Sequence, residues 1–364
     1  MNIDFANLQF QYQKYKVDID TKIQSILNKS NYIMGEEVVE LERSLEKFTG
    51  SKYAITCSSG TDALLLAMMA VDIKPGDEII TSPFTFISSA ETISFINAKP
   101  VFVDIEPDTF NIDANLIEAA ITKKTKAIMP VSLFGQPADM DTIYKIAKKY
   151  ALKVIVDGAQ SFGSVYKNKT DSNHGDISCT SFFPAKPLGC YGDGGAVFTD
   201  NEYYAEKMKM LRVHGQNKRY YHKYIGMGGR LDTIQAAILL AKLPHYKKEL
   251  EGRRKLASNY TTSLAHFLKT PIIKPSVLSA WAQYTLRVDN RESNQAKLKE
   301  DGIPTAIYYP MPLHLQECFS YLNYKKNDFP ISEKASEEVL SIPMNAFLSD
   351  DQVNYIVSKL KKII

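Results

Sequence analysis

The feature that most constrains the fold is a regular alternation of short apolar segments with helical patterns between residues 53 and 157. In chain order the expected elements are strand 53–57, helix 61–69, strand 78–81, helix 88–95, strand 100–103, helix 113–120, strand 127–132, helix 140–150 and strand 154–157. A strand joined to the next by a crossover helix pairs with it in parallel. We therefore predict an α/β fold with a mostly parallel seven-stranded sheet between helices, completed by strands at 177–183 and 196–199.

The length of 364 residues is long for one hydrophobic core, so we expect two domains. The large domain is predicted at 1–245 and begins with an arm that contains one helix. After an alanine-rich helix at 233–243 the pattern changes to long helices, a strand at 281–288 and a final helix behind the capping box 349–352. We predict a smaller α+β domain at 246–364.

Charge and composition exclude several classes of protein. The chain has 44 basic and 41 acidic side chains, so no polybasic surface for nucleic acid is expected. No apolar run approaches 18 residues and Met1 leads into polar residues, so neither membrane insertion nor secretion is expected. Four cysteines without CxxC spacing indicate a reducing compartment, and we predict a cytoplasmic protein with no metal site.

The segment 181–195 contains one lysine, Lys186, among small and aromatic residues, with two prolines and four glycines around it. Burial in such surroundings lowers the pKa of an amine and makes it a nucleophile that can form a Schiff base with a carbonyl group. The alternative for this residue taken alone is an exposed lysine in a loop.

Two further segments lie where predicted strands end, which is where open parallel sheets bind ligands. Ser59, Gly60 and Thr61 open a helix whose free N–H groups could hold a phosphate, although a simple helix cap fits them too. Asp157 ends an apolar strand, where it could pair with a ring nitrogen or cap a helix.

Aromatic and hydroxyl side chains add two more candidates. Ser181 precedes Lys186 by five positions and could join the phosphate site. Phe84 and Phe86 follow a predicted strand and could stack on a planar ring, with a place in the core as the alternative, better suited to Phe84. An amine, an acid, a phosphate site and an aromatic face are together the requirements of pyridoxal phosphate, whose ring serves as an electron sink.

These residues also carry a resemblance over nearly the full length. The motifs include 35–38, 59–63, 76–80, 84–86, 131–136, 157–160, 181–195 and 230–237. The chain resembles the sugar aminotransferases of the DegT/DnrJ/EryC1/StrS family, which implies the architecture of fold-type I pyridoxal phosphate enzymes and a homodimer with shared active sites. Family dehydratases have histidine in place of the lysine, so Lys186 favours transamination.

The resemblance implies a role for each candidate residue. Lys186 would form the Schiff base and move protons, Asp157 would pair with the pyridinium, and Gln160 would contact the ring hydroxyl region. Phe86 would stack on the ring. The phosphate contacts would come from Ser59, Gly60, Thr61 and Ser181, with Gly228 facing the cofactor of the other subunit.

Later segments at 282–293, 303–306 and 309–312 resemble family members that aminate UDP-linked 3-keto sugars for bacterial surface polysaccharides such as O-antigen and lipopolysaccharide. The implied amino donor is L-glutamate, and the implied acceptor is a 2-acetamido-3-oxo hexose or hexuronate. The residues near the substrate would be Met34, His214, Arg230, Tyr308 and Tyr309.

Three departures from the family pattern bear on these expectations. Relatives have asparagine at the position of Gly228 and histidine at that of Tyr308. Val156 and Gly158 replace the usual glutamate and alanine beside Asp157. The cofactor motifs leave open amination at C4 of a UDP- or dTDP-4-keto-6-deoxy sugar, another small ketone as acceptor, and a cofactor-binding homologue without turnover. A nicotinamide-dependent oxidoreductase is disfavoured because no GxGxxG opens a helix after a strand.

Overall fold

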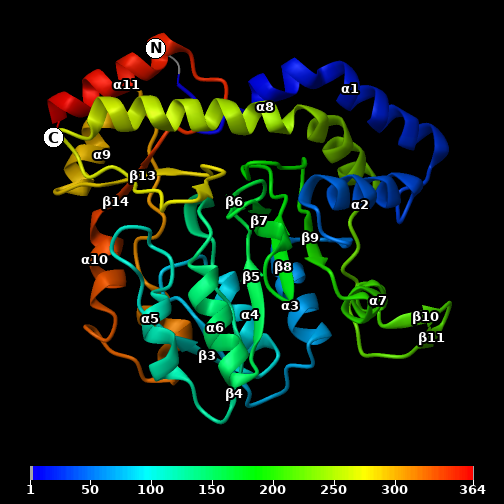
Figure 1. Cartoon of the computed structure of the whole chain (residues 1–364). Helices are drawn as coiled ribbons and strands as arrows, with labels where there is room; N and C mark the ends of the chain where they lie inside the picture. The colour runs from blue at the N-terminus through cyan, green and yellow to red at the C-terminus, as the bar shows by residue number, and fades with distance from the viewer. Residues whose placement is uncertain (1–2, 364) are drawn as a thin grey trace.

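A computed structural model describes residues 3–363, and its centre is a seven-stranded sheet (Figure 1). The strand order is β1 (Tyr53–Cys57), β9 (Gly195–Thr199), β8 (Ile177–Ser181), β5 (Lys153–Asp157), β4 (Thr125–Ile128), β2 (Glu78–Thr81) and β3 (Lys99–Phe102). β9 runs antiparallel to both of its neighbours, and the other pairs are parallel. The expected mostly parallel sheet is confirmed.

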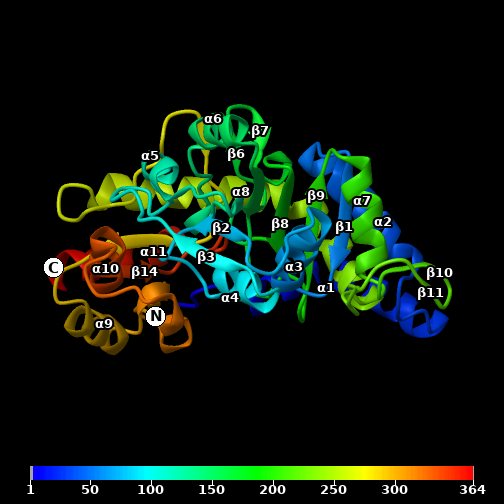
Figure 2. The same cartoon turned by 90° about the horizontal axis from the view of Figure 1, so that it is seen from below.

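Helices cover both faces of this sheet (Figure 2). One face packs against α3 (Gly60–Ala70), α4 (Ser88–Phe95) and α7 (Glu202–Leu211), and the other against α5 (Ala114–Ile117), α6 (Met140–Tyr150), α2 (Glu36–Thr49) and α8 (Thr233–Leu264). Successive residues of β5 point to opposite faces: Ile155 packs in the cluster with α3, while Val154 and Val156 pack with α6. Burial on both faces explains the continuous apolar strands in the sequence.

The C-terminal part has its own buried cluster, which includes Tyr260, Tyr284, Leu340 and Ile356. It is built on the antiparallel pair β13 (Tyr284–Arg287) and β14 (Val339–Ile342), with α9 (Arg291–Glu300), α10 (Pro330–Glu338) and α11 (Asp350–Ile363). The 32-residue helix α8 contacts both parts, packing against α1 (Leu8–Lys29), α2 and α11. The boundary near residue 245 falls inside α8, and the division at this point remains a proposal.

Short elements complete the chain. They are β6 (Val165–Tyr166) and β7 (Lys169–Thr170), which form a three-stranded sheet with β12 (Val277–Leu278), and the hairpin of β10 (Gln216–Lys218) and β11 (Tyr221–His222). The expected strand at 127–132 is shorter than predicted, because β4 ends before Pro130, which has no N–H to donate. The capping box is present: Ser349 N donates to Gln352 Oε1 at 2.9 Å, and Gln352 N donates to Ser349 Oγ at 3.2 Å.

No helix within residues 3–363 combines the length and apolar character needed to span a bilayer. All four cysteines are free thiols, of which only Cys318 is exposed.

Candidate active site

The predicted site residues gather at one edge of the sheet. Since β1, β2, β5 and β8 run in the same direction, their carboxyl ends lie at the same edge. These ends are Cys57, Thr81, Asp157 and Ser181. This edge is where ligands bind in open α/β sheets.

The start of α3 lies directly against Ser181. A Cβ on Gly60 would come within 2.7 Å of the Ser181 Cβ, so only glycine permits this approach. Ser59 Oγ caps the helix by accepting from Asp62 N at 3.0 Å, and Thr61 Oγ1 contacts Ser88 Oγ at 2.9 Å. The backbone N–H groups at 60 and 61 have no acceptor inside the helix, so they and the Ser181 hydroxyl form an anion-binding arrangement.

Asp157 is a buried carboxyl group with two hydrogen-bond donors. Ser89 Oγ donates to Asp157 Oδ2 at 2.7 Å, and Ala159 N donates to Oδ1 at 3.2 Å. Burial raises the pKa of this carboxyl group, while Ser89, Ala159 and the charge of Lys186 act in the opposite direction. No helix begins in the turn that follows β5, so a cap on a following helix is not its role.

Lys186 lies in a tight turn after β8, where its backbone N donates to Phe183 O at 2.7 Å. Burial lowers the pKa of the Lys186 ammonium group, and the negative charge of Asp157 opposes that shift. An amine of this kind loses its proton more readily than an exposed lysine.

Two residues of α8 that the sequence reading missed support this turn. The buried ammonium of Lys242 donates to the Gly189 carbonyl, and Gln235 Oε1 accepts from Tyr191 N at 2.8 Å. Burial lowers the pKa of Lys242 to about 8. The available signal was a lysine inside the apolar run 236–243, a pattern that requires a specific partner.

Gln160 and the aromatic residues form the next wall of the site. Gln160 Oε1 accepts from Phe134 N at 2.7 Å, and its Nε2 donates to the hydroxyl of Tyr309 at 3.0 Å. The rings of Tyr309 and Phe86 lie 6.2 Å apart, and that of Tyr308 lies 5.9 Å from Tyr309. Phe86 is 54% exposed and available for stacking, whereas Phe84 is in the core, as the sequence favoured.

A second group of predicted residues surrounds Gly228. A Cβ at this position would lie 3.2 Å from His214 Cε1 and 4.0 Å from a terminal nitrogen of Arg230. The next residue, Gly229, accepts at its carbonyl from Ser58 N at 3.1 Å, which ties the turn to the start of α3. Met34 packs against the cluster that joins α2 and α8 to the Lys186 turn through Phe182 and Leu188. Within residues 3–363, no hydrogen bond or ion pair joins Arg230 or Met34 to Lys186.

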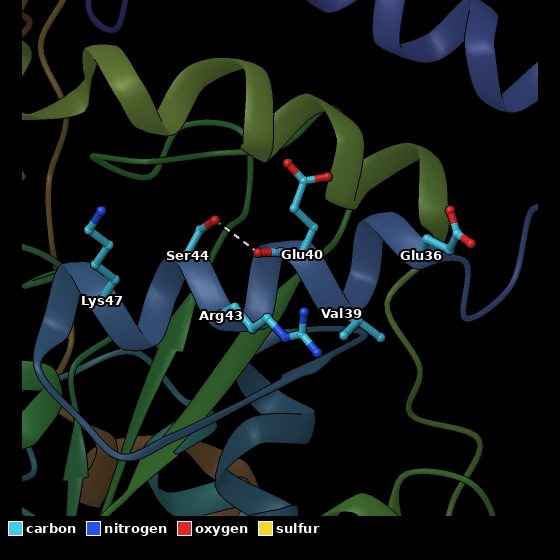
Figure 3. Close-up of a pocket in the computed structure, with 6 residues that line it drawn as sticks. All are labelled: Glu36, Val39, Glu40, Arg43, Ser44 and Lys47. Carbon is cyan, nitrogen blue, oxygen red and sulfur yellow. Dashed lines mark hydrogen bonds between the residues drawn. The ribbon is translucent and has the colours of Figure 1, made fainter.

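An open hollow on the outer face of α2 is separate from this edge (Figure 3). It is lined by Glu36, Val39, Glu40, Arg43, Ser44 and Lys47, none of which is a predicted site residue. The hydrogen bond drawn there is local, from Ser44 Oγ to Glu40 O at 2.8 Å.

The groups at this edge of the sheet fit pyridoxal phosphate. Lys186 has the lowered pKa that an amine needs to react with a carbonyl group, Asp157 is a buried acid, and the start of α3 with Ser181 suits a phosphate. When bound, this cofactor supplies an electron sink that stabilises negative charge on an adjacent carbon. A mostly parallel α/β fold with a reactive amine, a buried acid and an anion-binding helix start at one edge of the sheet is the arrangement of pyridoxal phosphate enzymes of fold type I.

The chain belongs to the DegT/DnrJ/EryC1/StrS aminotransferase family, whose model matches residues 13–361. It is 48% identical over 359 residues to UDP-2-acetamido-2-deoxy-3-oxo-D-glucuronate aminotransferase of Pseudomonas aeruginosa, covering 98% of this chain and 99% of that protein. It is 38% identical over 363 residues to UDP-N-acetyl-3-dehydro-alpha-D-glucosamine 3-aminotransferase of Acidithiobacillus ferrooxidans, covering 100% of this chain and 98% of that protein.

The fold is similar to the crystal structure of NtdA from Bacillus subtilis with the bound cofactor PMP. The TM-score is 0.93 at 30% identity, covering 100% of this chain and 85% of the other. The expected fold, the family and the class of enzyme, a pyridoxal phosphate-dependent aminotransferase, are confirmed.

Proposed function

We propose that the protein transfers an amino group from L-glutamate to C3 of a UDP-linked 2-acetamido-3-oxo sugar, in the biosynthesis of a bacterial surface polysaccharide. The observation that carries this proposal is the meeting of Lys186, Asp157 and the phosphate-type site of α3 at one sheet edge. The 48% identity to an enzyme named for a UDP-linked 3-oxo sugar supports the choice of acceptor.

In the proposed reaction Lys186 has two roles. Its amine would hold the cofactor, and as a free amine it would act as the base that removes a proton from the donor Cα. The lowered pKa supports this role, because the amine must be uncharged to accept that proton. The same amine returns a proton to the sugar carbon when the transfer runs in reverse.

The remaining residues bind and orient. Asp157 would hold the proton on the ring nitrogen of the cofactor, and Gln160 would contact the region of the ring hydroxyl. Phe86 would cover the ring, while Ser59, Gly60, Thr61 and Ser181 would hold the phosphate, an assignment supported by the 2.7 Å approach of a Cβ at Gly60 to Ser181.

The substrate contacts are assigned to Met34, His214, Arg230, Tyr308 and Tyr309. Arg230 forms no ion pair or hydrogen bond among the described residues, so its charge is available to an acidic group of the sugar nucleotide. Gly228 has no side chain to contribute, and a Cβ there would lie 3.2 Å from the ring of His214.

The test of this function is an amination screen by mass spectrometry with L-glutamate as donor. The panel contains UDP-linked 3-keto sugars with and without a C6 carboxylate, and UDP- and dTDP-4-keto-6-deoxy sugars, with Lys186→Ala as the blank. We expect product from a UDP-linked 3-keto sugar, with conversion at least about tenfold above the 4-keto sugars. Product only from 4-keto sugars or a small ketone would replace the proposed acceptor, and no product with any acceptor would favour a homologue without turnover.

We further infer a cytoplasmic homodimer whose subunits share active sites. Tyr220 and Ile225, which are close in sequence, and Phe183 are between 51% and 91% exposed, and an interface with a second subunit would cover such side chains. Subunits with Lys186→Ala and subunits with Arg230→Ala should each be inactive alone. If Arg230 serves the site of its partner, unfolding and refolding an equal mixture should restore about one quarter of wild-type activity, because a hybrid keeps one intact site. No restoration would contradict shared sites.

A further inference from the structure

A second buried carboxyl group lies behind Asp157. Asp171 follows β7 and is 1% exposed, and its backbone N donates to Ser164 O at 3.0 Å. Its Oδ2 lies 3.2 Å from the position that a Cβ of Gly158 would occupy, directly after Asp157. A Cβ at position 158 would also lie 2.9 Å from the Cys179 carbonyl and 3.1 Å from Ser161 Oγ, so glycine permits the close packing of this turn against Asp171.

Few hydrogen-bond donors are placed to stabilise an ionised Asp171 carboxylate. Within residues 3–363 the Ser161 hydroxyl contacts its Oδ2 and the Ser132 hydroxyl also favours the charged form, but no hydrogen bond of good geometry reaches the buried Oδ1. An ionised carboxylate in an apolar interior requires several donors, and an unsatisfied oxygen carries the full cost of its desolvation. The neutral acid fits this pocket better.

The contacts of Ser161 also indicate that the Asp171 carboxyl group carries a proton. Ser161 Oγ contacts both Asp171 Oδ2 and the Gly158 carbonyl, the latter at 3.2 Å, but a hydroxyl has one hydrogen to donate. A protonated Asp171 would satisfy both contacts at once by donating to Ser161, which then donates to the Gly158 carbonyl, an acceptor also for Thr180 Oγ1 at 3.2 Å. This series of hydrogen bonds ends at Gly158, the residue that follows Asp157.

We propose that Asp171 is a positioning residue for Asp157: when protonated, it braces the turn at Gly158 and leaves Asp157 as the only negative charge here, and when ionised, it adds a second negative charge beside it. This inference rests on the proposed function, in which Asp157 pairs with the ring nitrogen of the cofactor. The acidity of the bound cofactor then depends on the protonation of Asp171.

The titratable groups around Asp171 support this assignment. Asp157 approaches from β5, Tyr144 from α6, and His174 lies in the same turn. Burial and the charge of Asp157 raise the pKa of Asp171 to about 6, against the effect of the Ser161 and Ser132 hydroxyls. Burial lowers the pKa of His174 to about 4, so this imidazole is neutral where Asp171 titrates.

The test compares Asp171→Asn with wild type and with Asp108→Asn, an exposed carboxyl as the matched control. Each protein is loaded with pyridoxal phosphate, and the visible absorption of the bound cofactor is titrated with pH. Removing a nearby negative charge makes a protonated cofactor less stable, so the midpoint should fall by about half a pH unit or more in Asp171→Asn. Asp108→Asn should titrate as wild type does.

Ser161→Ala provides a second variant in case Asp171→Asn does not fold. It removes a donor to the charged form of Asp171, so it should lower the midpoint in the same direction by a smaller amount. Unchanged midpoints in both variants would overturn the inference. A wild-type protein that takes up no cofactor would instead count against the proposed function.

Denaturation of the cofactor-free proteins tests the proton on Asp171 independently. The folded state holds this proton more tightly than the unfolded chain, so wild type loses stability as pH rises from about 4 to about 6. Asp171→Asn avoids this loss, and its unfolding equilibrium constant relative to wild type should fall by roughly thirtyfold over that range. A constant ratio across that range would show that Asp171 is ionised throughout and would contradict the proposal.

Discussion

Replacing Lys186 with alanine is expected to reduce turnover at least about ten-thousand-fold, because the proposed reaction uses this amine both as a covalent group and as a base. Lys186→Arg should fail to a similar extent, since a guanidinium group retains positive charge but does not release its proton near neutral pH. The measurement is conversion of keto sugar with L-glutamate. Lys169→Ala, an exposed lysine, is the matched control and should retain wild-type turnover.

The same substitution should not weaken the fold. Because burial lowers the pKa of Lys186, the folded protein holds this proton less tightly than the unfolded chain, and the charge costs stability at pH values below that pKa. The cofactor-free Lys186→Ala protein should therefore melt at the same temperature as wild type or higher, at about pH 7. Near-normal turnover in a folded Lys186→Ala protein would exclude the assignment.

Most of the sheet could be predicted from the sequence because both faces of its strands are buried. Strands such as β2 and β5 have apolar centres, at 79–80 and 154–156, and are separated by helices of regular periodicity, so their positions follow from pattern alone. β4 was placed too far along the chain, because the apolar residues Met129 and Val131 continue the pattern past Pro130, where regular pairing ends. The reversed direction of β9 depends on tertiary pairing that no local pattern contains.

The site was partly predictable for a similar reason. Motifs at strand ends identified Asp157, Ser181 and the start of α3, since parallel strands bring their carboxyl ends to one edge. The residues missed, Ser89, Phe134 and Lys242, act across 26 to 68 positions of sequence through single hydrogen bonds. Contacts of this kind depend on how the elements pack, which local sequence spacing does not specify.

Asp157→Asn is expected to lower turnover by roughly a thousandfold, while making the cofactor-free protein more stable. The turnover falls because breaking a buried charge pair costs about 3–5 kcal/mol, and asparagine cannot hold a proton on the ring nitrogen of the cofactor. Stability rises because burial raises the pKa of Asp157, so the ionised carboxylate destabilises the folded state above the pKa of the unfolded chain. The gain in melting temperature should be present at about pH 8 and vanish toward about pH 4.

The variant Ser89→Ala tests the hydrogen bond to Asp157 separately from the negative charge of Asp157. Ser89 Oγ donates to Asp157 Oδ2 at 2.7 Å, and this bond favours the ionised carboxylate. Its loss should reduce turnover only roughly tenfold, because the carboxylate remains and keeps the bond from Ala159 N. Equal losses in Asp157→Asn and Ser89→Ala would mean that the geometry of this turn matters rather than the charge. Wild-type turnover in Asp157→Asn would contradict the pairing with the cofactor nitrogen, because a neutral amide would then serve as well as the buried acid.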